Sequence, residues 1–179
     1  MKRIIIFILA VVWTVTAFAQ GSVLKQTLEI AEVEIDDGDI LISVFNMPEG
    51  DQNQYYLCVG TLGFGDSFIQ LEIDPLFQLF IPLGGTLDEA QAKLEEFKNV
   101  AKLPTGTGIE TVGCLALANP STGELEPVSV TSKRFFIQRI ISFSVQRNGY
   151  VRASHVPRID FNALVTSVNL YRKIHPNEP

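Results

Sequence analysis

The sequence predicts an α+β domain, with an antiparallel or mixed β-sheet and two helices packed on it. Three observations favour this class. The first is a hairpin whose turn and burial pattern agree on one register. The second is an amphipathic helix with a capping box, and the third is an order of strands followed by a helix in each half of the chain. Residues 20–179 are expected to form this single domain, preceded by a signal peptide at 1–19.

The hairpin turns at Asp37-Gly38, a pair that tolerates the positive φ angles of a type I′ turn. Pairing outward from the turn gathers apolar residues on one face: Ile35 with Ile40, Val33 with Ile42 and Ala31 with Val44. The other face then brings together Glu34 with Leu41, Glu32 with Ser43 and Ile30 with Phe45. Turn chemistry and burial therefore predict the same register.

The rest of the first half is predicted to form strands over 55–62, 68–73 and 77–83, the last containing Pro82 as a sign of a sheet edge. Thr86 and Glu89 then have the spacing of a capping box, which satisfies free backbone N–H groups where a helix begins. Apolar residues follow at helical spacing: Leu87, Ala90, Leu94, Phe97 and Ala101. Pro104 is expected to end this helix.

The second half is predicted to contain strands over 111–118, 125–131, 134–146 and 150–156, with a turn at Asn148-Gly149. The register that this turn predicts pairs the apolar face of one strand with Arg152 and Ser154 of the next. A β-bulge would restore the agreement between the two faces. Asp160 is expected to cap a final helix, although β-branched residues leave a final strand as the alternative. The inward face of that helix would carry Phe161, Leu164, Val165, Val168 and Tyr171.

The N-terminal segment has the three parts of a signal peptide. Lys2 and Arg3 precede an uncharged run that ends in Ala17-Phe18-Ala19, a small-x-small pattern for signal peptidase. This run is shorter than the roughly 20 apolar residues of a spanning helix. We therefore expect cleavage after Ala19, a secreted or periplasmic protein, and no stable membrane insertion afterwards. An uncleaved anchor is the alternative.

The charges are acidic in sum and unevenly placed. The whole chain has 14 basic and 20 acidic residues, a net charge of −6 that becomes −8 without the signal peptide. Such acidity excludes a general attraction to nucleic acid or anionic lipid. Residues 29–96 nevertheless hold fifteen acids and one base, whereas residues 133–173 hold eight bases and one acid. Solvated or paired charges are the simpler interpretation of this asymmetry.

The sharper interpretation is a basic face for an anionic ligand, such as a glycan, a lipid headgroup or an acidic partner. Its candidate ligand-binding residues are Arg139, Arg147, Arg152 and Arg158. Arg139 stands out because it falls on an otherwise apolar strand face, where a buried guanidinium needs partners. In order of preference, we expect a bulge that turns it outward, a pairing with an acid of the first half, or an anionic ligand.

Cys58 and Cys114 are the only cysteines, and each lies in an apolar, strand-like run. Outside the cytoplasm they could form one disulfide. Two separately buried thiols are the equal alternative, since a free cysteine packs as a small hydrophobe.

No motif for catalysis, a metal or a cofactor stands out. The segment 60–65 echoes a phosphate-binding loop but leads into a predicted strand, and Asp36, Asp37 and Asp39 lack the spacing of a calcium loop. His155, near Asp160, is the remaining catalytic candidate, although no G-x-S-x-G motif presents a serine to it. We therefore expect a non-enzymatic domain that binds an unknown protein or an anionic ligand. The alternatives are a hydrolase using His155 with a residue brought close by folding, and an inhibitor or immunity-type protein.

Overall fold

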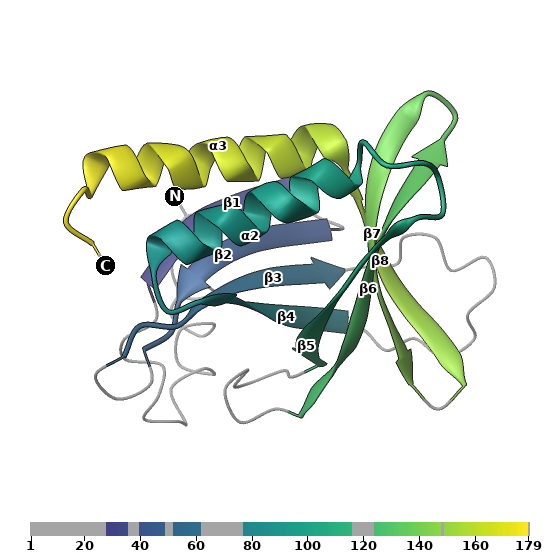
Figure 1. The fold of residues 1–179 in the computed structure, drawn as a ribbon, viewed down its shortest axis with the longest axis horizontal. Coiled ribbons are helices and arrows are strands. Elements are labelled where there is room, and N and C mark those ends of the chain that lie inside the picture. The colour runs from purple at the N-terminus through teal and green to yellow at the C-terminus, as the bar shows by residue number, and fades with distance from the viewer. Residues whose placement is uncertain are drawn as a thin grey trace, which may run out of the picture.

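The computed structural model describes residues 28–35, 40–48, 52–61, 77–115, 124–147 and 149–178. Their strands form one eight-stranded antiparallel sheet in which every strand pairs with its neighbours in sequence (Figure 1). The strands are β1 (Leu28–Ile35), β2 (Ile40–Asn46), β3 (Tyr55–Thr61), β4 (Phe77–Gly84), β5 (Gly108–Leu115), β6 (Leu125–Phe135), β7 (Gln138–Arg147) and β8 (Tyr150–Pro157). Helix α2 (Leu87–Val100) joins β4 to β5, and α3 (Arg158–Ile174) follows β8. The predicted α+β class is confirmed.

The sheet bends sharply in the middle, so that β6, β7 and β8 turn away from the direction of β1 to β4 (Figure 1). Among the described residues, two pairs connect the halves at this bend, Leu79 with Leu115 and Phe80 with Cys114. Both helices lie side by side on the inner face of the bend (Figure 1). In the part of the chain that the structure describes, each half thus consists of four strands followed by one helix.

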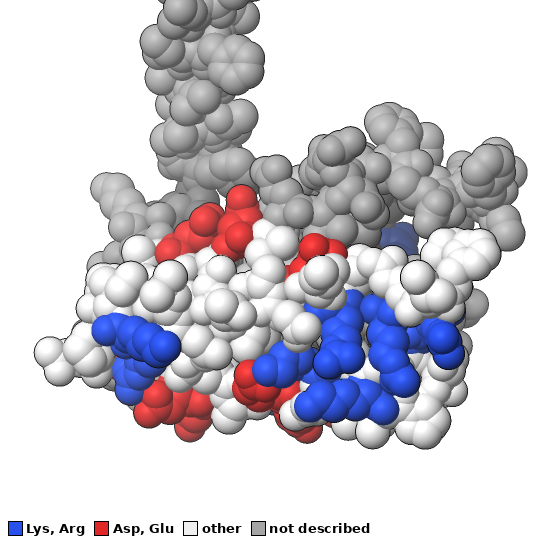
Figure 2. All heavy atoms as spheres, turned by 90° about the horizontal axis from the view of Figure 1, so that it is seen from above, with Lys and Arg blue, Asp and Glu red and all other residues white. Residues whose placement is uncertain are grey.

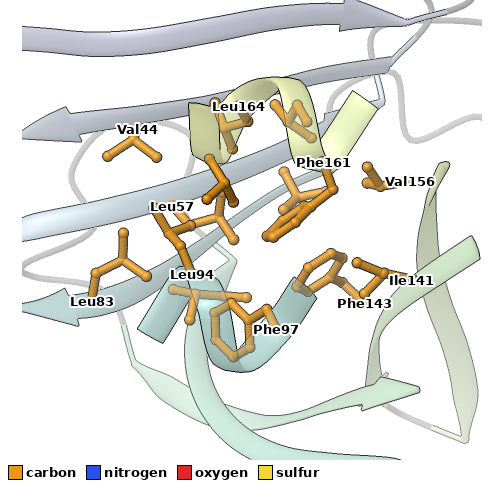
Figure 3. Close-up of a cluster of buried hydrophobic side chains, with 14 of the residues drawn as sticks. Val44, Leu57, Leu83, Leu94, Phe97, Ile141, Phe143, Val156, Phe161 and Leu164 are labelled. Atoms are coloured by element: carbon orange, nitrogen blue, oxygen red, sulfur yellow. The ribbon is translucent and has the colours of Figure 1, made fainter. Parts of the chain in front are cut away.

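The core lies between the helices and this inner face. Side chains from both halves of the sheet and from both helices point toward one another there (Figure 3). Phe143 of β7 packs between Phe97 of α2 and Phe161 of α3, with ring centroids 5.8 Å and 6.0 Å away. The two halves therefore share a single core.

The predicted register of β1 and β2 is confirmed from Ile35 opposite Ile40 to Ala31 opposite Val44. It is wrong at Ile30, because a register shift between Glu29 and Ala31 places Glu29 opposite Phe45. The shift allows Ile30 and Ala31 both to be buried, which strict alternation would prevent. The turn itself, the signal peptide at 1–19, segment 62–65 and the predicted strand at 68–73 lie outside the described residues.

The capping box of α2 is confirmed. The Glu89 backbone N–H donates to Thr86 Oγ1 at 3.2 Å, and Glu89 Oε2 accepts from the backbone N–H of Thr86 at 3.2 Å and of Gly85 at 2.8 Å. Gly84 has a φ of +129°, and a Cβ there would lie 2.6 Å from Glu89 side-chain atoms. The predicted apolar face is buried, and Ala101 is the C-cap.

The prediction of a strand beginning at Arg134 is wrong, because β6 continues to Phe135 and the chain reverses at Phe136-Ile137. Phe136 takes a φ of +52°, the only positive φ of a non-glycine residue in the described chain. A turn of this shape usually contains Gly, Asn or Asp. The sequence offers none here, so the turn could not be recognised.

The β7–β8 hairpin keeps a regular register, so the expected bulge is absent. Val145 does face Arg152, and Phe143 does face Ser154. Ser154 is consequently buried in the inner face, and its hydroxyl has no hydrogen-bond partner among the described residues.

The last element is the predicted helix, and the strand alternative is wrong. Phe161, Leu164, Val165 and Val168 are buried as expected, and Tyr171 is partly buried. Asp160 does not cap the helix, because Pro157 occupies the N-cap and makes no side-chain cap bond. Asp160 instead lies in the first turn, where its charge complements the helix dipole.

Candidate functional site

The structure divides the four candidate arginines between opposite ends of the β7–β8 pair. Arg139 and Arg158 lie near the β6–β7 hairpin, whereas Arg147 and Arg152 belong to the β7–β8 hairpin, which points the other way (Figure 1). The eight residue-to-residue steps from Arg139 to Arg147 span about 27 Å of strand. One small ligand cannot contact all four, so these arginines do not form the single basic face envisaged from the sequence.

Arg139 shows neither the expected bulge nor an ion pair with an acid of the first half among the described residues. No register shift occurs at its position in β7. Its Nη1 donates to the carbonyl oxygens of Ala101 at 2.7 Å and Leu103 at 3.3 Å. These carbonyls follow the end of α2, where a cation also complements the helix dipole. Because Arg139 lies beyond the core, near the end of the hairpin, its side chain is exposed rather than buried.

This contact assembles a cluster of five cations at one end of the molecule. Lys102 lies between the two carbonyls that Arg139 binds, and Arg134 stands directly opposite Arg139 in the β6–β7 ladder. Lys133 pairs with Ile140, whose other neighbour Pro157 leads into Arg158. All five side chains are exposed, and the group is called the basic end below: Lys102, Lys133, Arg134, Arg139 and Arg158. Figure 2 shows Lys and Arg gathered at this end.

The cations of the basic end differ from three others on the helices, which form ion pairs. Lys93 pairs with Glu96, Lys98 with Glu95, and Arg172 with Asp88. Within the described residues, no member of the basic end forms an ion pair with a carboxylate. Asp160, in the first turn of α3, is the acidic residue of this region. Counted over the described residues, this end of the acidic protein therefore carries an excess of positive charge.

The β6–β7 hairpin carries a contiguous apolar tip in front of these cations. The tip consists of Phe135, Phe136 and Ile137, which are 62%, 83% and 90% exposed. The rings of Phe135 and Phe136 meet edge to face, 4.8 Å apart. Arg134 Nε donates to the carbonyl oxygen of Phe136 at 3.0 Å, and this hydrogen bond stabilises the backbone of the turn. The sequence predicts a continuous strand over 134–146, so the hairpin tip could not be recognised from the sequence.

The catalytic candidate His155 lies directly opposite Ser142 on the sheet face away from the helices. The serine is completely buried, and its Oγ makes no hydrogen bond, so the imidazole does not hold it as an activated nucleophile would be held. The described residues contain no cluster of His, Cys, Asp and Glu suited to a metal ion. Sequence reasoning did not single out Ser142, since only the β7–β8 register brings it to His155.

Cys58 and Cys114 are both free thiols. They lie on the same sheet face with Phe80 between them, since Phe80 pairs with Cys58 on one side and Cys114 on the other. Two strand spacings separate their backbones by about 10 Å, too far for a disulfide. Burial raises the pKa of Cys58 to about 12 and also raises the pKa of Cys114. Both therefore act as packed apolar groups.

Among the described residues, no helix is long and apolar enough to cross a membrane. Comparison with protein-family models, curated proteins and solved structures finds no match to the chain.

Proposed function

We propose that this chain is a non-enzymatic binding domain that recognises an anionic partner through the basic end. The observation that carries the proposal is the pairing of Arg134 directly against Arg139. Like charges directly opposite in a sheet destabilise it. Between them lies no carboxylate to relieve the repulsion, in the part of the chain that the structure describes. An anionic partner would supply the missing negative charge.

The geometry of the cluster suits an oxyanion. A guanidinium presents a planar fork of N–H donors that matches carboxylate, sulfate or phosphate. Arg139 uses Nη1 on the Ala101 and Leu103 carbonyls, which orients its side chain without neutralising it. The helix end thus pre-organises one arginine, and the hairpin places a second beside it. If residues 1–19 direct export, as the sequence predicts, the partner lies outside the cytoplasm.

The proposal is tested by measuring the binding of dextran sulfate, a soluble polyanion, as the salt concentration rises. We expect the affinity to fall steeply with salt, because the interaction is electrostatic. The double variant Lys133→Gln/Arg158→Gln removes two charges from the basic end without touching a hydrogen bond of the turn. It should weaken binding by about tenfold, as expected for the loss of two exposed ion pairs worth about 0.7 kcal/mol each.

The matched control is Lys93→Gln/Lys173→Gln, which changes the net charge equally on residues away from the basic end. This control should bind dextran sulfate like the parent chain. Equal losses in the two double variants, or binding that does not respond to salt, would overturn the proposal.

A further inference from the structure

We infer that the anionic partner is a lipid bilayer, with the hairpin tip entering the membrane interface and the basic end binding the headgroups. This inference rests on the proposed function and goes beyond it by naming the partner. Four properties of the β6–β7 hairpin support it: its exposed apolar side chains, their distance from the cations, the conformation of the turn, and the distribution of charge over the molecule.

The apolar side chains of the hairpin tip are unusual in being contiguous and almost entirely in water. Isolated exposed hydrophobic residues are normal, but adjacent ones mark an interaction site. Phe136 and Ile137 form the outermost turn, and Phe135 adjoins them. At the same end, Ile159 in the first turn of α3 is 71% exposed beside Arg158. These apolar side chains are the kind that a membrane interface accommodates.

The spacing of apolar and charged residues matches the layering of an anionic bilayer. The headgroup region on each side of the hydrocarbon is about 5–8 Å thick. Arg134 lies two residues behind Phe136, and Arg139 two residues behind Ile137, which corresponds to about 7 Å of strand. When the turn reaches the edge of the hydrocarbon, the backbone positions of both arginines are therefore level with the lipid phosphates. Cations at that depth attract anionic lipids.

The backbone of the turn favours the same interpretation. Phe136 adopts a φ of +52°, in a region that an aromatic residue rarely occupies and that glycine adopts freely. Conformational strain of this kind is found where function requires it. Here a phenylalanine at the outermost point presents an aromatic ring that glycine could not. The Arg134 hydrogen bond to the Phe136 carbonyl then holds the ring in front of the charges.

The distribution of charge would orient the protein on the surface. Its net charge without residues 1–19 would be −8, which by itself repels an anionic bilayer. On the face seen in Figure 2, however, Lys and Arg outnumber Asp and Glu at the basic end. The bilayer would attract the basic end and repel the rest of the protein. The protein would therefore approach the bilayer in one orientation, with the hairpin tip first. The net negative charge of the protein would thus help to orient it on an anionic bilayer.

A protein partner fits the hairpin less well than a bilayer. A stable protein interface buries about 800 Å² on each partner and requires complementary shape. The hairpin tip is a narrow projection with three large apolar side chains, so a protein would need a matching pocket. A fluid interface needs none, because lipids rearrange around the projection. A soluble acidic protein is therefore the alternative outcome of the test.

The test compares the binding of the exported protein to vesicles of phosphatidylcholine alone and to vesicles that also contain phosphatidylglycerol. We expect binding only when phosphatidylglycerol is present. The variant Phe136→Ser/Ile137→Ser should lose at least about tenfold in vesicle affinity while keeping its affinity for dextran sulfate. The matched control Leu170→Ser/Ile174→Ser removes two exposed apolar residues from the other end of α3 and should bind vesicles like the parent. Thermal unfolding checks that each variant is folded.

A fluorescent reporter measures the position of the turn directly. Trp13 is the only tryptophan of the sequence and lies in the predicted signal peptide, so Ile137→Trp would be the sole tryptophan after cleavage. Its emission should shift to the blue on phosphatidylglycerol vesicles and stay unchanged with dextran sulfate. If the signal segment were retained, the substitution Trp13→Phe would remove the emission of Trp13. Any lipid affinity of the segment itself would be the same in all variants.

The possible outcomes separate the two proposals. If the parent chain binds dextran sulfate but not the anionic vesicles, or if the Phe136→Ser/Ile137→Ser variant binds vesicles undiminished, the membrane is excluded. The basic end then serves a soluble anionic partner, such as an acidic protein. An unshifted Ile137→Trp emission on bound vesicles likewise overturns insertion. If the parent binds neither probe, both proposals fail.

Discussion

The Tyr55 hydroxyl donates a hydrogen bond to Glu178 Oε1 at 3.2 Å, which ties the end of the described chain to β3. The backbone carbonyl of Glu178 also accepts from Arg172, and Arg172 forms an ion pair with Asp88 at 2.9 Å. These contacts lie at the end of α3 remote from the basic end. They couple the C-terminal residues to the first half of the fold through groups that titrate.

The Tyr55 contact predicts a loss of stability at alkaline pH. Burial, assisted by the carboxylate of Glu178, raises the pKa of Tyr55 to about 12. The unfolded chain has a pKa of about 10 for tyrosine, so the folded protein holds this proton more tightly. The resulting contribution to the free energy of unfolding is complete below about pH 10 and is lost as the pH rises toward 12. Burial also raises the pKa of Tyr171, which adds in the same direction.

Urea unfolding at about pH 8, 10 and 11, on both sides of the ordinary pKa of tyrosine, measures this loss. Ultraviolet titration of tyrosinate should show two of the four tyrosines ionising late. Glu178→Gln removes the charge but retains an oxygen acceptor, and it should lower the pKa of Tyr55. Ionisation of all four tyrosines near their ordinary pKa would contradict the expected coupling.

The capping box predicts a stability effect at the start of α2. Thr86→Ala removes the acceptor of the Glu89 backbone N–H and should lower the free energy of unfolding by about 1 kcal/mol. Thr86→Ser keeps the hydroxyl and serves as the control. Urea denaturation of the two variants measures the difference. If the serine variant loses as much stability as the alanine variant, the cap bond is not the cause.

The shared core predicts that both halves unfold together. Phe143 is fully buried between Phe97 and Phe161, so Phe143→Ala should cost about 3–5 kcal/mol. Thermal unfolding should remain a single transition at a lower temperature, because the core joins elements of both halves. Phe135→Ala, at the exposed hairpin tip, removes the same side chain and should leave stability nearly unchanged. Two separate transitions in the Phe143 variant would mean that the halves fold independently.

The unpartnered hydroxyl of Ser154 predicts a stabilising substitution. A buried polar group without a hydrogen bond costs about 1–3 kcal/mol. Ser154→Ala removes that group from the inner face and should raise the free energy of unfolding by about 1 kcal/mol. Ser144 is the contrasting site, because its Oγ donates to the Ser129 carbonyl at 3.3 Å, and Ser144→Ala should not stabilise. Chemical denaturation distinguishes the two, and destabilisation by Ser154→Ala would show that its hydroxyl has a partner.

Elements whose signals are local could be predicted from the sequence. The β1–β2 register follows from alternation on either side of Asp37-Gly38, and the start of α2 follows from Thr86 and Glu89. In both cases residues close in the chain supply the chemistry and the burial pattern together. The bulge at Ile30 could not be predicted, because it depends on what the helices bury beneath the sheet.

The candidate site could be predicted only in part. The excess of basic residues in 133–173 is plain in the sequence, but their division between two ends depends on where the chain reverses. The turn at Phe136-Ile137 has no turn-forming residue, so its sequence pattern is that of a strand interior. Arg139 does share the helix-facing side of β7 with Ile141 and Phe143, as predicted, but it lies beyond the core and against the end of α2.

The sequence by itself determined the class of fold, the first hairpin, the amphipathic helices and the charge asymmetry, because each is encoded by composition or by short-range periodicity. Only the tertiary structure decided that Arg139 binds the Ala101 carbonyl, that Arg134 faces Arg139, and that Phe136 stands exposed in front of them. These relationships join a helix end to a hairpin formed much later in the chain, as the separation of 38 positions between Ala101 and Arg139 shows. No local pattern records such a contact, since it arises from how the two halves pack around one core.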